Sequence, residues 1–174
     1  MMSSQPPKSF TDPARTTPIG MLRYAIEFYA AARATDSAIG DMDGYEITAP
    51  TPVNYLMGHA IELGLKAYLL NSGRSLADIK SIGHRLRLAY NEARQAGLDE
   101  HFQPKAEDVT VLDALDPLYS DKQFEYIETG PKTFPVFGPL QHFARELLLG
   151  VTRAIPNGEL FLRDGYKAGQ FLLR

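Results

Sequence analysis

Two stretches decide the fold: Tyr55-Leu-Met-Gly-His-Ala-Ile-Glu-Leu-Gly-Leu-Lys-Ala-Tyr-Leu-Leu70 and Gly83-His-Arg-Leu-Arg-Leu-Ala-Tyr-Asn-Glu-Ala-Arg-Gln-Ala-Gly97. Apolar residues recur in both at the three- and four-residue spacing of an amphipathic helix. This spacing predicts that the buried face of the first helix is formed by Leu56, Ala60, Leu63, Ala67 and Leu70. Polar side chains interrupt both apolar patterns, so some of them are expected to pair inside the protein.

The same reasoning, applied outward from these two stretches, predicts further helices joined by short turns. Pro18, Pro52 and Pro139 each suit the first turn of a helix, where a missing backbone N–H costs nothing. The sequence therefore predicts an all-α fold, an up-and-down bundle of four to five helices. The expected helices cover residues 18–38, 51–70, 76–82, 84–96, 106–115 and 139–155, with Asp116-Pro117 ending the fifth.

Two segments outside these helices favour extended structure. Within 123–137, residues 123–129 alternate at period two before Gly130-Pro131, and residues 133–138 could pair with them. Within 159–173, Asp164-Gly165 is typical of a two-residue hairpin turn. Residues 1–17 contain several prolines and are predicted to be a disordered leader. The expected organisation is this leader, a bundle domain at 18–156, and a hairpin or tail at 157–174 that packs on the bundle or on a partner subunit.

The composition restricts the function classes. The chain has 174 residues, a net charge of −3 and no cysteine. This excludes disulfides and cysteine-bound metal centres, fits a cytoplasmic protein, and argues against a protein that coats nucleic acid. No apolar run is long enough to span a bilayer, so no membrane partner is expected. No cofactor or metal is predicted, because His59 with Glu62 and His142 with Glu146 do not reproduce the Glu-x-x-His motifs of bundle di-metal sites.

The polar residues of the two deciding stretches form one candidate site. Glu62 and Lys66 are four residues apart, and His59 lies on the same helical face. These groups could transfer protons, form a local ion pair, or tie Glu62 to His84 on a neighbouring helix. The cations near His84 are either a solvated helix face or a patch that binds anions. The candidate binding or structural cluster is His59, Glu62, Lys66, His84, Arg85 and Arg87.

The pattern Glu62-x-x-x-Lys66-Ala67 followed by Gly83-His84-x-Leu86 resembles the HEPN family of prokaryotic helical-bundle proteins. The resemblance implies a helical bundle that is often a homodimer and that is linked to RNA or nucleotide biology. Many members of the family act as binding or regulatory modules without catalytic activity, and this is the function we expect here.

Other HEPN proteins are metal-independent ribonucleases that use an arginine followed, after four to six residues, by a histidine. Arg94 and His101 have six residues between them and are the candidate catalytic pair of this alternative. Histidine can remove the proton of a ribose 2′-OH, and arginine can hold the charged phosphorane. Gly97 is expected to end a helix between the two, so the family's catalytic pattern is displaced in this chain.

Overall fold

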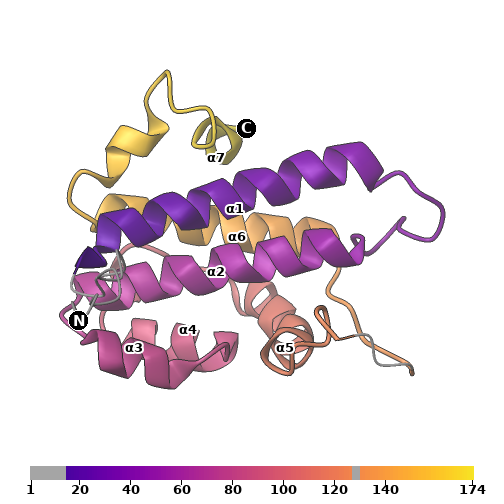
Figure 1. Cartoon of the computed structure of the whole chain (residues 1–174), viewed down its shortest axis with the longest axis horizontal. Coiled ribbons are helices and arrows are strands. Elements are labelled where there is room, and N and C mark those ends of the chain that lie inside the picture. The colour runs from indigo at the N-terminus through magenta and orange to yellow at the C-terminus, as the bar shows by residue number, and fades with distance from the viewer. Residues whose placement is uncertain (1–14, 127–129) are drawn as a thin grey trace, which may run out of the picture.

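The computed structural model of the protein describes residues 15–126 and 130–174, and all the regular secondary structure in these ranges is helical. The two longest helices, α1 (Pro18–Ile39) and α2 (Thr51–Asn71), run side by side, and α6 (Phe137–Ala154) lies behind them (Figure 1). Below this layer come α3 (Leu76–Ile82), α4 (Leu86–Gln95) and α5 (Ala106–Ser120). The predicted all-α bundle is confirmed.

Local sequence explains most of the helix boundaries. The Thr17 hydroxyl accepts the backbone N–H of Gly20 at 3.1 Å and caps α1 just before Pro18. Ser75 and Asp78 form a reciprocal capping box at the start of α3. Gly97, with a φ of 97°, supplies the left-handed backbone that separates α4 from the 3-10 helix η2 (Leu98–Glu100).

The start of α4 has a cap that comes from another helix. Its N-cap residue, Arg85, makes no side-chain cap, and α4 begins at Leu86, slightly later than predicted. The Asp116 carboxylate on α5 accepts the backbone N–H of Leu86 at 2.5 Å instead. Burial raises the pKa of Asp116 above its ordinary value, although hydrogen bonds from the α4 backbone act in the opposite direction. This contact fixes α5 against the first turn of α4.

The prediction that α5 ends at Asp116-Pro117 is wrong, because the helix continues to Ser120 with Pro117 inside it. A proline within a helix removes one backbone hydrogen bond and costs about 3 kcal/mol. Leu115, Leu118 and Tyr119 are all buried on either side of the proline. Their burial offsets that cost, so tertiary packing overrides the local preference.

The two predictions of extended or hairpin structure are also wrong. Between 123 and 137 the described residues form turns and irregular backbone, and residues 127–129 lie outside the described ranges. The 159–173 segment forms the 3-10 helix η3 (Gly158–Leu162) and the short helix α7 (Gln170–Leu173). The segment packs on α1 and α6 as well as on itself, and Leu172 is fully buried (Figure 1). Of the predicted leader, residues 1–14 lie outside the described ranges.

The hydrophobic core joins α1, α2 and α6 with the shorter helices. The predicted buried face of α2 is confirmed in part, since Ala60 and Ala67 are fully buried whereas Leu56, Leu63 and Leu70 are only partly buried. None of the described helices is both long and apolar enough to cross a bilayer. Large side chains that are fully buried include Leu22, Ile26, Tyr29, Met57, Ile61, Leu65, Leu69, Leu86, Leu98, Leu112, Leu115 and Phe143.

Candidate functional site

Glu62 is the centre of the candidate site. It lies in the middle of α2 and is only 3% exposed, so its charge must be matched by nearby donors. Lys66, one turn further along α2, donates to Oε1 at 2.5 Å. The Lys66 ammonium also donates to the Gly83 carbonyl at 2.7 Å and thereby holds the turn between α3 and α4 against α2.

Two residues from other elements complete the shell around Glu62. His84, which follows Gly83 in that turn, places its Nδ1 3.2 Å from the carboxylate. Tyr119 on α5 donates its hydroxyl to Oε2 at 2.5 Å. The predicted tie from Glu62 to His84 is therefore present in the structure. Tyr119 was not among the sequence candidates, and nothing local in the sequence indicates that this residue faces α2.

Close packing brings the Tyr119 ring to this position. A Cβ added to Gly58 would lie 2.6 Å from Cδ2 of Tyr119. Gly58 stands one helical turn from Glu62, so the missing side chain leaves room for the ring directly beside the carboxylate. The space at Gly58 and the phenol of Tyr119 together let α5 reach Glu62.

The surrounding donors control the ionisation of the cluster. Burial by itself raises the pKa of Glu62, but the hydrogen bonds that the carboxylate receives outweigh burial and lower the pKa from 4.5 to about 2. Burial raises the pKa of the Tyr119 phenol, and the negative charge of Glu62 raises it further. Glu62 is therefore a carboxylate and Tyr119 a neutral donor throughout the neutral pH range.

This proton arrangement fixes the tautomers of both histidines. The Tyr119 hydroxyl gives its one proton to Glu62, so toward His59 Nδ1, which lies 2.8 Å away, it can only accept. His59 therefore carries a proton on Nδ1. His84 carries one there as well, because the carboxylate beside it only accepts. In the neutral form of each ring, Nε2 then holds a lone pair, and neither Nε2 makes a hydrogen bond to a described residue.

Aromatic rings surround the exposed edge of the cluster. Tyr55 and His59 lie in nearly parallel planes, 6° apart, with centroids separated by 6.3 Å. Phe28 on α1 supports the His59 ring edge-on at 4.3 Å. The side chains of His59 and His84 are 27% and 46% exposed, so the cluster presents imidazole and phenol to solvent above a buried charge. We call Tyr55, His59 and His84 the aromatic rim.

Arg85 and Arg87 do not join Glu62, although the sequence suggested them as members of one cluster. Arg85 donates to the carbonyls of Ser81 and Ile82 and so caps the end of α3. Arg87 reaches α5, where its Nε lies 3.6 Å from Asp113. Both arginines therefore stabilise the ends and packing of neighbouring helices, although they follow His84 closely in the sequence.

Arg94 and His101, the candidate catalytic pair, are placed apart. The Arg94 guanidinium binds both oxygens of Asp99 at 3.0 to 3.1 Å and lies over the Tyr90 ring. Hydrogen bonding to Asp99 raises the pKa of Arg94 further above its ordinary value. His101 follows η2 and lines a hollow beside α6, whereas Arg94 lines two other hollows. Within the described part of the chain, none of these hollows contains both side chains.

The chain was compared with known proteins, and no family model, no curated protein and no solved structure matches it. The resemblance to the HEPN family rests on the residues around Glu62, Lys66 and His84 alone. Membership of that family stays a prediction.

Proposed function

We propose that this protein is a HEPN-like binding module without catalytic activity, and that its aromatic rim contacts unpaired bases of RNA. The observation that carries the proposal is the partly exposed aromatic rim, held in place by a buried and fully ionised Glu62. A base stacked on an aromatic ring gains about 1–3 kcal/mol, whatever its identity. The rings are positioned before any ligand binds, which lowers the entropic cost of stacking.

The chemistry of the rim also suits the edges of bases. The outward Nε2 atoms of His59 and His84 can accept hydrogen bonds from exocyclic amino groups or from a ribose 2′-OH. Nucleotides share these chemical groups with RNA, so a free nucleotide is a natural competitor in any binding assay.

Two observations argue against the ribonuclease alternative. Arg94 already uses its guanidinium on Asp99, and the hollow beside His101 does not contain Arg94. A phosphorane bound between the two would require Arg94 to leave Asp99 and both side chains to converge. A histidine base must also lie within hydrogen-bond reach of the proton that it removes.

The experiment is a fluorescence-anisotropy titration of labelled single-stranded RNA in EDTA, with wild type, Tyr55→Ala and Tyr166→Ala. Tyr166 is the control, because it too contacts a neighbouring ring, that of Phe161, and its hydroxyl donates to Glu27. It belongs to the segment between η3 and α7, which lies on the side of α1 away from α2 (Figure 1). We expect Tyr55→Ala to weaken binding about tenfold, from the stacking energy above, and Tyr166→Ala to leave it unchanged.

Equal losses in the two variants, or no RNA binding by the wild type, would reject the proposal. The same samples, analysed on a denaturing gel, test the alternative. If the RNA is cut in EDTA and His101→Ala abolishes the cutting, the protein is a ribonuclease and the binding-module proposal fails.

The proposal includes a homodimer, as the resemblance implies, and a cytoplasmic location, which fits the absence of cysteine. A shallow, mostly apolar hollow between α1 and α2, lined by Met21, Tyr24 and Leu63 among others, supports a protein contact at that face. Light scattering coupled to size-exclusion chromatography measures the oligomeric state directly. A monomer at high micromolar concentration would remove this part of the proposal.

A further inference from the structure

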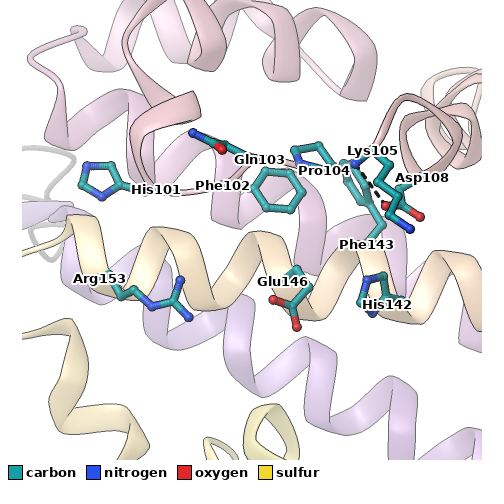
Figure 2. A pocket seen from close by; sticks show the side chains of 10 residues that line it. All are labelled: His101, Phe102, Gln103, Pro104, Lys105, Asp108, His142, Phe143, Glu146 and Arg153. Atoms are coloured by element: carbon teal, nitrogen blue, oxygen red, sulfur yellow. Dashed lines mark hydrogen bonds between the residues drawn. The ribbon is translucent and has the colours of Figure 1, made fainter.

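A second polar hollow lies outside the cluster around Glu62, between the loop that follows η2 and the helix α6 (Figure 2). Its volume is about 290 Å³, close to the lower limit for sites that bind small molecules. The loop contributes residues 101–105, and α6 contributes one face. The side chains on that face are His142, Phe143, Glu146 and Arg153.

The hollow has a rigid base. Phe102 and Phe143 meet edge-to-face at 5.3 Å, and Tyr90 packs against both. The loop backbone lies directly on α6 at Gly150, where an added Cβ would stand 2.7 Å from the His101 carbonyl. Because the loop is pinned at this point, the hollow exists before any ligand binds.

Both carboxylates that line the hollow already have partners. Asp108 accepts the backbone N–H of Lys105 at 3.1 Å, and Glu146 is paired with Arg145. Figure 2 shows the Asp108 contact at the edge of the hollow. Arg145 therefore compensates the charge of Glu146, whereas Asp108 keeps its charge at the edge of the hollow.

The cations in the hollow are less engaged. The Arg153 guanidinium makes no hydrogen bond or ion pair with any residue in 15–126 or 130–174, and it lines the hollow together with His101 and His142 (Figure 2). The Lys105 ammonium has one ion contact, at 3.7 Å from an exposed Glu107. The hollow thus contains one guanidinium, that of Arg153, without a partner among the described residues, above a partly apolar base.

We propose that this hollow binds the phosphate monoester of a small molecule, with Arg153 as the principal phosphate ligand. A guanidinium binds two phosphate oxygens at once, which gives both direction and affinity. His101 lies at the same end of the hollow as Arg153 (Figure 2) and can provide a further donor. The volume limits the organic group to one of roughly nucleoside size, seated against Phe102 and Phe143. This proposal is independent of RNA binding at the aromatic rim.

The test is isothermal titration of the full chain with adenosine 5′-monophosphate, adenosine and inorganic phosphate as three separate probes. Arg153→Gln is compared with Arg163→Gln, which removes another exposed arginine, from the C-terminal segment. We expect the monophosphate to bind at least tenfold more tightly than either fragment, and Arg153→Gln, but not Arg163→Gln, to weaken it at least tenfold.

Inorganic phosphate that binds as tightly as the monoester would overturn the proposal, because the site would then recognise a bare anion. Unchanged affinity in Arg153→Gln would overturn it as well, and would assign Arg153 to the end of α6, where a cation interacts favourably with the helix dipole. Nitrogen-15 spectra of the histidine rings provide an independent readout. His101 and His142 should shift on addition of the monophosphate, whereas His59 and His84 should not.

Discussion

The shell around Glu62 and the ion pair of Arg94 with Asp99 both join a carboxylate to a cation, but they differ in burial and in the parts of the chain that they connect. Glu62 is buried and binds groups from α2, from the α3–α4 turn and from α5. Arg94 and Asp99 are about half exposed and five residues apart, so their contact joins only neighbouring parts of the chain. Both regions contain charged groups at short distances. They differ because only Glu62 is buried and has partners from different elements, and this is why only the contacts of Glu62 hold separate parts of the fold together.

The largest expected effect is that of Glu62→Leu. The substitution removes the counter-charge of Lys66, which keeps only the Gly83 carbonyl, and the acceptor of the Tyr119 hydroxyl. Breaking a buried pair by removing one partner costs about 3–5 kcal/mol. Urea unfolding followed by circular dichroism measures the loss. Glu62→Gln keeps the shape and one acceptor oxygen, so it should lose less. A Glu62→Leu protein as stable as the wild type would mean that the shell does not hold the elements together.

The second effect is a dependence of stability on pH that is specific to Glu62. Its pKa is about 2 in the folded protein, against 4.5 for an unperturbed glutamate, so the carboxylate stabilises the folded state fully above about pH 4.5. That contribution, on the order of 3 kcal/mol, is lost as pH falls from 4.5 toward 2. The difference in unfolding free energy between wild type and Glu62→Gln should therefore shrink over this interval. A difference that stays constant from pH 5 to pH 2 would contradict the assignment.

A smaller effect comes from two glycines of α2. An added Cβ at Gly58 meets the stiff Tyr119 ring, whereas at Gly64 it meets the flexible end of Leu148, at the same 2.6 Å. Overpacking costs about 1–3 kcal/mol where the neighbour cannot move. Gly58→Ala should therefore destabilise the protein more than Gly64→Ala in urea unfolding, and should weaken RNA binding because it displaces Tyr119. The reverse order would mean that the Tyr119 ring is not fixed.

The smallest effect is expected for Asp99→Ala. The Arg94 pair is exposed, and such pairs contribute little. The unfolding midpoint should match that of the wild type within experimental error, and so should RNA binding. If this variant were as unstable as Gly58→Ala, the contrast between the two regions would disappear.

Much of the architecture could be predicted from periodicity and local chemistry. The sequence indicated all the longer helices, and α3 was predicted with its observed bounds, because caps and glycines act within a few residues. Asp164-Gly165 was misleading, since hairpin chemistry is outweighed when flanking apolar residues such as Leu172 find a core to enter. The path of α5 through Pro117 was missed for the same physical reason.

The candidate site was only partly accessible to sequence reasoning. Glu62, Lys66 and His84 could be grouped because helical spacing and a short turn bring them together. Tyr119 lies 57 residues beyond Glu62, and only the packing of α5 on α2 determines that they meet. Arg85 and Arg87 were grouped with the others by proximity in the chain, but side-chain direction sends them to other partners.

The cap that Asp116 provides to Leu86 has a consequence for how the protein assembles. The first backbone amide of α4 is satisfied by a side chain thirty positions later in the chain. Because α4 is short and an N-cap contributes about 1 kcal/mol, docking of α5 should add stability to an α4 that already packs on α2. A nascent or proteolysed chain that ends before α5 would expose the Glu62 shell and the end of α4 at the same moment.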